Sequence, residues 1–225
     1  IERWHRALLH KKQAIFYGPP GTGKTFTALQ FASFMTQCHA GFFEVVQFHP
    51  AYAYEDFMQG LRPTASEGGG LRYDLEPGRF LEFCRRAAQV DAPCVLIIDE
   101  INRANLSRVF GELMYLLEYR DKSIPLSAGG EAFRIPGNVY IIGTMNTADR
   151  SIALVDFALR RRFAFLALAP SANALRNFHK GHSIEPLVEQ LIKGAAEINA
   201  AINDVNYALG MSFFMVNNLK ESIED

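Results

Sequence analysis

The residues of this chain best suited to chemistry form a glycine-rich segment near its start. Residues 18–25 read GPPGTGKT, which satisfies the phosphate-loop spacing GxxxxGK[ST], between a short apolar run and a helix-compatible stretch. Glycines let backbone N–H groups curl round phosphate oxygens, and the start of the next helix adds a favourable dipole. The residues predicted to contact a nucleotide here are Gly18, Pro19, Pro20, Gly21, Thr22, Gly23, Lys24 and Thr25.

Two side chains of this segment have predicted chemical roles. Lys24 reaches the β- and γ-phosphates of a nucleoside triphosphate, ATP or GTP, and the Thr25 hydroxyl ligates Mg²⁺. The alternative is a glycine-rich turn that binds nothing. It is disfavoured because the whole motif stands between a strand-like and a helix-like segment.

A second pair of reactive side chains follows the apolar run at residues 95–98. After a phosphate loop, the acidic pair Asp99 and Glu100 indicates a metal-and-water element. We expect Asp99 to hold Mg²⁺, through water, and Glu100 to orient or deprotonate the attacking water, the step that separates a hydrolase from a nucleotide binder. The alternative is an acidic pair that only caps the next helix.

The apolar run at residues 139–144 leads into MNTADRS, residues 145–151, which allows two interpretations. Read as N-T-A-D, Asn146 and Asp149 are similar to the guanine-reading NKxD element of small GTPases. Read as a polar strand end beside the phosphate loop, Asn146 faces the γ-phosphate and positions the water. Small GTPases also need a DxxG element, and no Asp of this chain has Gly three residues later. We favour the γ-phosphate interpretation over the guanine reading and over a residue that merely satisfies turn backbone.

Three adjacent arginines, residues 160–162, close a helix-like segment just before the apolar run that starts at Phe163. Such a triplet is usually a solvated or anion-facing patch. In a phosphate-loop protein that assembles in rings, an arginine at this place enters the neighbour's site and neutralises transition-state charge, an effect of roughly 10³ to 10⁵ in rate in other NTPases. From the order of the motifs, we predict this catalytic role for Arg161 and Arg162.

The elements that position these residues can be read from apolar runs. Residues 24–37 are compatible with a helix, and the apolar residues of 105–118 recur with helical periodicity. Five runs are typical of buried strands, with intervening segments long enough for crossover helices: residues 14–17, 43–48, 95–98, 139–144 and 163–166. The predicted fold class is therefore α/β, with a parallel five-stranded sheet and helices on both faces.

Two breaker-rich stretches and the C-terminal part complete the organisation. Residues 63–78 and 121–137 are expected to form loops or hairpins. After Pro170, a helical stripe with no comparable strand-like run predicts a small helical lid: Leu187, Leu191, Ala195, Ile198 and Ile202. We predict a nucleotide-binding core at residues 1–169 and a lid, incomplete here, at residues 170–225.

Composition limits the remaining classes of function. The 225 residues are 49% apolar and carry 23 basic against 24 acidic side chains, a formal net charge of −1, so no global pull toward nucleic acid or membrane is expected. No apolar run approaches the roughly 20 residues of a membrane-spanning helix. Three cysteines without CxxC spacing favour a reducing compartment, the cytoplasm, and argue against a zinc site. The start at Ile1 indicates a segment of a longer protein.

The order of these motifs is that of P-loop NTPases of the AAA+ superfamily. Their amino-acid sequences resemble those of the McrB-like motor subunits of McrBC methylcytosine-dependent restriction systems. The resemblance extends over nearly all of residues 14–169. Its most specific phrases are MNTADRS and DEINRANLS. It is carried by VQFHP (residues 46–50), YEDF (54–57), IDEINRAN (98–105), MNTADRS (145–151) and ALRRRF (158–163).

This resemblance implies a nucleotide-hydrolysing ring, commonly hexameric, that uses GTP in the best-known members and is stimulated by an McrC-like nuclease partner. It implies DNA binding by a region that precedes the motor and lies outside this segment. Asn146, Asp149 and Arg150 match the family's signature loop, and Arg161 and Arg162 match its interface arginines.

The resemblance weakens after Pro170. There, GMSFF at residues 210–214 is similar to the family's GHSYF, with Met and Phe in place of His and Tyr, so no second sensor in the lid follows from it.

Three alternative classes of function are opposed by particular residues. A P-loop kinase would need neither Glu100 nor the arginine triplet. A non-catalytic interaction module, in which nucleotide only locks a ring, would not need Glu100 and Asn146. A MoxR-like remodelling chaperone shares the DEINRA phrase, but the MNTADRS loop opposes it.

Overall fold

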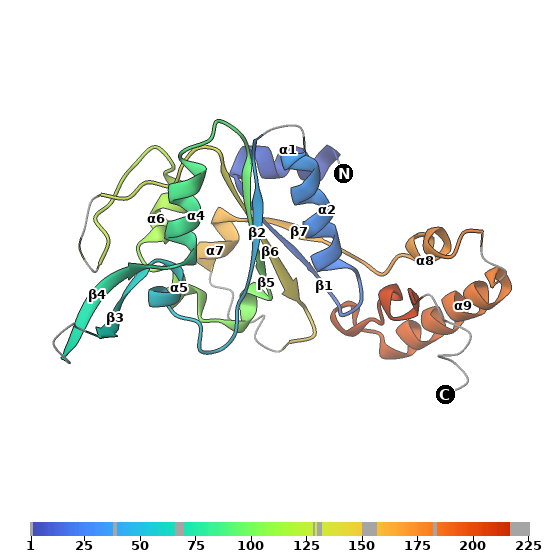
Figure 1. Cartoon of the computed structure of the whole chain (residues 1–225). Helices are drawn as coiled ribbons and strands as arrows, with labels where there is room; N and C mark the ends of the chain where they lie inside the picture. The colour runs from blue at the N-terminus through green and yellow to red at the C-terminus, as the bar shows by residue number, and fades with distance from the viewer. Residues whose placement is uncertain are drawn as a thin grey trace.

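The fold is built round one parallel sheet (Figure 1). The computed structural model describes residues 2–37, 40–65, 70–127, 129, 132–149, 157–181 and 184–216. The sheet has the order β2-β5-β6-β1-β7, and its strands are β1 (Gln13–Gly18), β2 (Phe43–Gln47), β5 (Cys94–Asp99), β6 (Val139–Asn146) and β7 (Ala164–Ala167). All neighbouring strands in it pair in parallel. The predicted α/β fold with a five-stranded parallel sheet is confirmed.

Helices cover both faces of this sheet. In Figure 1, α1 and α2 lie on one face, and α4, α5 and α6 lie on the other. The α-helices are α1 (Glu2–Lys11), α2 (Lys24–Thr36), α3 (Tyr54–Phe57), α4 (Arg79–Ala87), α5 (Leu106–Phe110), α6 (Leu113–Glu118), α7 (Phe157–Arg162), α8 (Ala172–Phe178) and α9 (Glu185–Ile202). Short 3₁₀ helices are η1 (Ile101–Arg103), η3 (Val205–Tyr207) and η4 (Met211–Phe214).

The strand β5 shows how the sequence builds two cores. Its side chains alternate between the two faces of the sheet, because strand side chains repeat with a period of two residues. Val95 and Ile97 join the cluster that includes α1 and α2, whereas Leu96 and Ile98 join the cluster that includes α4, α5 and α6. A strand buried on both faces must be apolar throughout. Asp99 is its first residue that is not fully buried, and this is where the acidic pair can begin.

One predicted helix is in fact two short helices. The periodicity of residues 105–118 predicts a single helix, but the chain breaks at Gly111 between α5 and α6. Gly111 has φ 46° and ψ −127°, which lies outside the helical region and is accessible because glycine has no β-carbon. A β-carbon there would lie 3.4 Å from the ring of Tyr54. The apolar period continues across the break because both helices pack into the same cluster.

The two breaker-rich stretches adopt different structures. Residues 63–78 lie mostly in an antiparallel hairpin of β3 (Gln59–Ala65) and β4 (Leu71–Pro77), which projects from the body of the molecule in Figure 1. The hairpin begins four residues earlier than the predicted stretch. In the described part of residues 121–137, a single antiparallel bridge joins Ile124 and Phe133. The expectation of hairpins or loops therefore holds for both stretches.

The C-terminal helices have a small core of their own. Leu175 of α8, Val188 and Ala195 of α9, and Met211 of η4 are buried together. The predicted stripe is partly wrong, because Ile198 and Ile202 are 50% and 40% exposed. The packed side of α9 is decided by where α8 and η4 lie, which periodicity does not reveal. The division between residues 169 and 170 stays a prediction. No helix in the described ranges has the length and apolar character to cross a bilayer.

Candidate active site

The glycine-rich loop joins the sheet to a helix at the carboxyl edge of the sheet. β1 ends at Gly18 and α2 begins at Lys24. Gly21 and Gly23 have φ 73° and 77°, in the left-handed region that a β-carbon disfavours. At Gly18, a β-carbon would lie 2.1 Å from the carbonyl oxygen of Leu168. Glycine is therefore required at three positions of the motif for reasons of geometry.

Lys24 lies inside this loop. Its Nζ donates to the carbonyl oxygens of Gly18 and Pro19 at 3.0 and 2.8 Å, and to Asn146 Oδ1 at 3.3 Å. Burial lowers the pKa of the Lys24 ammonium, and the negative charges of Asp99, Asp149 and Glu100 oppose that change. The loop thus holds a partly desolvated cation against backbone carbonyls and near three acids.

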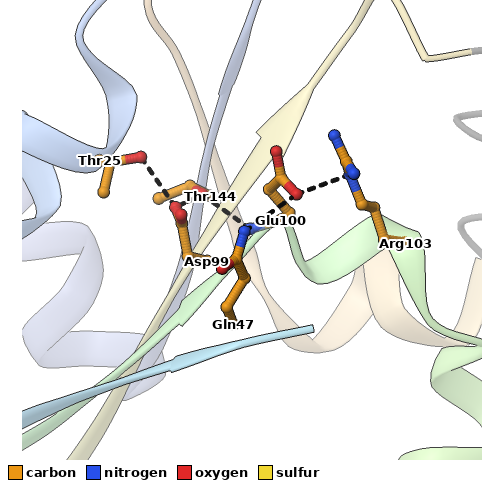
Figure 2. A network of polar contacts seen from close by, with 6 residues as sticks. All are labelled: Thr25, Gln47, Asp99, Glu100, Arg103 and Thr144. Carbon is orange, nitrogen blue, oxygen red and sulfur yellow. Dashed lines mark hydrogen bonds and ion pairs between the residues drawn. The ribbon is translucent and has the colours of Figure 1, made fainter. Parts of the chain in front are cut away.

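Asp99 joins the loop to two neighbouring strands, as Figure 2 shows. Its Oδ1 accepts from Thr25 Oγ1 at 2.8 Å and from Thr144 Oγ1 at 2.6 Å. The first hydroxyl comes from α2 and the second from β6, so one carboxylate oxygen ties three elements together. Carboxylate and hydroxyl oxygens are ligands that suit Mg²⁺ when phosphates and water complete its shell, so this donor set fits the predicted metal. Among the described residues, no group of three or more His, Cys, Asp or Glu side chains forms a separate metal site.

Glu100 has an unusual backbone conformation and three polar partners. Its φ and ψ of 53° and 45° are left-handed, which is uncommon for a residue with a side chain. Its N–H donates to Thr144 Oγ1 at 3.1 Å. Its carboxylate pairs with Arg103 Nε at 2.6 Å and accepts from Gln47 Nε2 at 3.4 Å (Figure 2). The carboxylate therefore lies at the edge of the site, between η1 and the end of β2.

Asn146 and Asp149 both belong to the Lys24 surroundings. Asn146 ends β6 directly opposite Gly18, in the register that pairs β6 with β1. The Thr147 N–H donates to the Gly18 carbonyl at 3.0 Å, which fixes the turn after the strand. Asp149 Oδ2 is buried and lacks a hydrogen-bond partner, and its charge acts on Lys24. Asp149 of the signature loop therefore lies near Lys24, whereas Arg150 lies outside the described residues.

These side chains surround a pocket of about 360 Å³. Its lining includes Lys24, Thr25, Asp99, Glu100 and Asn146, and also Ser212 from the C-terminal part of the chain. Five of the predicted residues are therefore brought together from three separate stretches of sequence, and Ser212 adds a fourth.

The two interface arginines lie elsewhere and differ from each other. Arg161 is 75% exposed and has Glu118 Oε1 at 3.7 Å, whereas Arg162 is 16% exposed and pairs with Glu118 Oε2 at 2.9 Å. The Arg162 carbonyl accepts from Gln13 Nε2 at 2.9 Å. Because Gln13 and Gly18 are the two ends of β1, this contact lies about 17 Å from the phosphate loop at 3.3 Å per residue. Within one chain, these arginines do not reach the pocket.

Several contacting residues were not predicted. Thr144, Gln47 and Arg103 touch the acidic pair, and Ser212 lines the pocket. A polar residue near the end of an apolar run, as at Gln47 and Thr144, is a signal that could have been used. Arg103 lies in the IDEINRAN phrase, three residues after Glu100, and Ser212 lies in the GMSFF stretch, but neither phrase by itself indicates a contact with the site.

Known proteins show similarity to this chain over the same region. A family model described as AAA domain (dynein-related subfamily) matches residues 13–163. The Type IV methyl-directed restriction enzyme EcoKMcrB subunit of Escherichia coli is 44% identical over 95% of this chain and 48% of its own length. The Type II restriction enzyme BsuMI component YdiS of Bacillus subtilis is 27% identical over 68% of this chain and 56% of its own length. A proteasome-activating nucleotidase of Methanoregula boonei is 30% identical over 67% of this chain and 28% of its own length.

This chain spans about half the length of the two restriction-system relatives that it matches. The matched family region contains the phosphate loop, the acidic pair, Asn146 and the arginine triplet. The resemblance found in the sequence is confirmed by these matches. The chain belongs to the AAA domain family, in its dynein-related subfamily, and is an McrB-like AAA+ domain.

Proposed function

We propose that this domain binds and hydrolyses a nucleoside triphosphate, ATP or GTP, as the ring-forming motor part of an McrBC-like restriction system. One observation carries the proposal. Lys24, Thr25, Asp99, Glu100 and Asn146 converge on one pocket at the carboxyl edge of the sheet. Ligands of open α/β sheets bind at this edge.

Binding rests on the loop and on Lys24. The loop N–H groups and the Lys24 ammonium complement phosphate charge, and Lys24 exchanges its contacts with the Gly18 and Pro19 carbonyls for phosphate oxygens. Thr25 and Asp99 would hold Mg²⁺, and a bound Mg²⁺ would neutralise part of the phosphate charge. Because the Lys24 ammonium is already partly removed from water, little further desolvation opposes its contact with phosphate.

Hydrolysis requires an oriented water molecule. Glu100 is the general base in this proposal, and Asn146 holds the water and the γ-phosphate from the opposite strand end. The Asn146 Oδ1 distance of 3.3 Å to Lys24 Nζ supports the γ-phosphate role over guanine reading, because Lys24 serves the phosphate end of the nucleotide. Glu100 must turn its carboxylate from Arg103 toward the pocket before it acts as a base.

The arginines supply the part of the site that a single chain lacks. We propose a closed ring, hexameric as the family resemblance implies, in which Arg161 reaches the nucleotide of the next copy. Its exposure supports this role. Arg162 would have to give up its pair with Glu118 first, so it is the weaker candidate of the two.

The partners of the whole protein are part of the same proposal. The restriction names of the Escherichia coli and Bacillus subtilis relatives support a place in a restriction system. An McrC-like nuclease subunit would stimulate hydrolysis, DNA would bind through regions outside this segment, and the cytoplasm is the proposed location. A second candidate is a MoxR-like remodelling ATPase, and similarity to a proteasome-activating nucleotidase favours a remodelling role of that kind.

One hydrolysis assay tests the proposal. Phosphate release is measured with ATP and with GTP, with and without the McrC-like subunit, for the parent protein and for Glu100→Gln. We expect turnover that Glu100→Gln lowers by roughly 10²-fold or more and that the nuclease subunit raises. Hydrolysis without any response to that subunit would favour the remodelling candidate, and no hydrolysis in either condition would contradict both.

A further inference from the structure

The C-terminal part of the chain is hydrogen-bonded to the backbone of the phosphate loop. The Gly210 N–H donates to the Pro20 carbonyl at 3.1 Å, and the Ser212 N–H donates to the Gly21 carbonyl at 2.9 Å. Figure 1 shows this segment beside the loop that joins β1 to α2. Nearly two hundred residues therefore separate two stretches of backbone that are hydrogen-bonded to each other.

The two backbones approach so closely that side chains are excluded. A β-carbon on Gly210 would lie 2.1 Å from the Gly21 carbonyl carbon and 2.4 Å from the Pro20 oxygen. A β-carbon on Gly21 would lie 2.5 Å from the ring of Phe213. Gly210 is itself buried in this contact. Glycine at position 210 is thus a requirement of the contact with the loop.

The same segment also reaches the end of β6. Thr147 Oγ1 donates to the Asn206 carbonyl at 3.0 Å, and Thr147 directly follows Asn146. Residues 206–213, which we call the clasp, therefore contact both the phosphate loop and the turn that carries Asn146.

The hydrogen bonds of the clasp fix the direction of two N–H groups. In a trans peptide, the C=O of one residue and the N–H of the next point in opposite directions, and the described chain has no cis peptide. A Pro20 carbonyl held toward Gly210 directs the Gly21 N–H the other way. In the same way, the hydrogen bond from Ser212 to the Gly21 carbonyl directs the Thr22 N–H away from Ser212. No described residue accepts a hydrogen bond from either N–H.

Without the clasp, these peptide planes would be free to turn. Gly21 has φ 73°, and glycine adopts positive and negative φ almost equally well, so rotation of the planes beside it costs little. A loop that samples several orientations binds phosphate more weakly, since ordering it opposes binding.

We propose that the clasp orients the Gly21 and Thr22 N–H groups toward the phosphates of the nucleotide, which makes Gly210 a positioning residue of the site. This inference rests on the proposed function, because it needs a phosphate ligand in the loop. The C-terminal helices then act on affinity through backbone geometry, without needing a charged side chain in the pocket.

The test compares two glycine substitutions in the same C-terminal part. In Gly210→Ala, the β-carbon forces the clasp off the loop, whereas at Gly194 in α9 a β-carbon meets nothing within 4 Å. The dissociation constant of a non-hydrolysable triphosphate is measured by fluorescence titration for both variants. We expect Gly210→Ala to weaken binding about tenfold or more, since two charge-assisted hydrogen bonds lose their fixed direction, and Gly194→Ala to match the parent.

A softer variant keeps the test valid if Gly210→Ala does not fold. Phe213→Ala removes the ring that packs on Gly21 and leaves the backbone free to fold, and we expect a several-fold weaker affinity at an unchanged melting temperature. The proposal is overturned if a folded Gly210→Ala or Phe213→Ala variant binds the triphosphate as tightly as the Gly194→Ala control. The clasp would then only attach the C-terminal helices to the core. Lys24→Ala is titrated in parallel: if it binds like the parent, the proposed function has failed, whatever the clasp variants do.

Discussion

The pocket at the carboxyl edge of the sheet and the arginine end of α7 differ in how fully their charges are paired. In the pocket, Lys24, Asp99 and Glu100 each have at least two polar partners within the chain. At the end of α7, Arg161 is 75% exposed and its nearest carboxylate oxygen is 3.7 Å away. An exposed, loosely held pair of this kind contributes little to stability.

This difference separates two tasks of the proposed enzyme. Nucleotide binding is prepared inside one chain, because loop, cation and acids are already assembled there. The charge of Arg161 is free for another molecule. We therefore expect substitutions in the pocket to act at any protein concentration, and a substitution of Arg161 to act only where copies meet.

The largest effect is expected at Lys24. Lys24→Ala removes the loop's only cationic side chain from the phosphates, and we expect triphosphate binding to be lost in calorimetry. Lys122→Ala, which removes an exposed lysine paired with Asp121, is the matched control and should bind like the parent. Equal affinities of Lys24→Ala and the control would refute the phosphate-loop assignment.

Arg161 gives the sharpest test of the contrast. Arg161→Ala should lower hydrolysis by roughly 10³-fold or more at concentrations where copies associate, as such arginines do in other NTPases, with binding unchanged. Arg160→Ala, which removes the exposed neighbouring arginine, is the control. The measurement is specific activity against protein concentration: full turnover with a flat profile in a demonstrably monomeric sample would exclude a shared site.

Glu100→Gln is expected to uncouple binding from turnover. The amide keeps the size of the side chain and most of its hydrogen bonding but cannot accept the proton of the water, so turnover should fall by roughly 10²-fold or more while affinity survives. Single-turnover phosphate release together with calorimetry checks both parts. Persistence of the parental rate would mean that another group activates the water.

Asn146 and Asp149 test where base recognition lies. Asn146→Ala should lower turnover for every accepted nucleotide and leave relative affinities unchanged, because Asn146 Oδ1 lies at the Lys24 end of the pocket. Asp149→Asn should leave the preference between ATP and GTP unchanged for the same reason. A shift of that preference toward xanthosine or adenosine nucleotides in Asp149→Asn would instead support guanine reading by this loop.

The smallest effect, and the one that separates neighbouring arginines, is on stability. Arg162 is mostly buried, and Arg162→Ala leaves Glu118 without its close partner. We expect the free energy of unfolding, measured in urea, to fall by about 1 to 3 kcal/mol. Arg161→Ala should change it by less than about 0.5 kcal/mol, since its pair is exposed. The reverse order would contradict the assignment of the closer and more buried ion pair to Arg162.

The parts of this site that follow from local sequence were predictable, and the parts that follow from strand pairing were not. Lys24 and Thr25 depend on one turn, and Asp99 on the end of one apolar run, so motif and periodicity suffice for them. Thr144 contacts Asp99 because β6 lies beside β5, and that register joins residues 45 positions apart in the chain. No periodicity within one segment contains this information.

The same reasoning explains the remaining differences. Arg161 is exposed and Arg162 is not, and this difference depends on Glu118 at the end of α6, more than 40 residues earlier. The break at Gly111 depends on backbone dihedrals, which an apolar period does not report. Helix α1 was not predicted at all, although its Leu8 is 1% exposed in the cluster beneath the sheet.

The strand order has a consequence for how the protein is made. β1 is the first strand of this sheet to be synthesised, yet its partners in the sheet are β6 and β7, the last two of the sheet. About 120 more residues must therefore be synthesised after β1 before either of its neighbouring strands can pair with it. Contacts of such separation in sequence slow folding and leave apolar strands unpaired meanwhile. The nascent chain therefore acquires phosphate binding late in its synthesis.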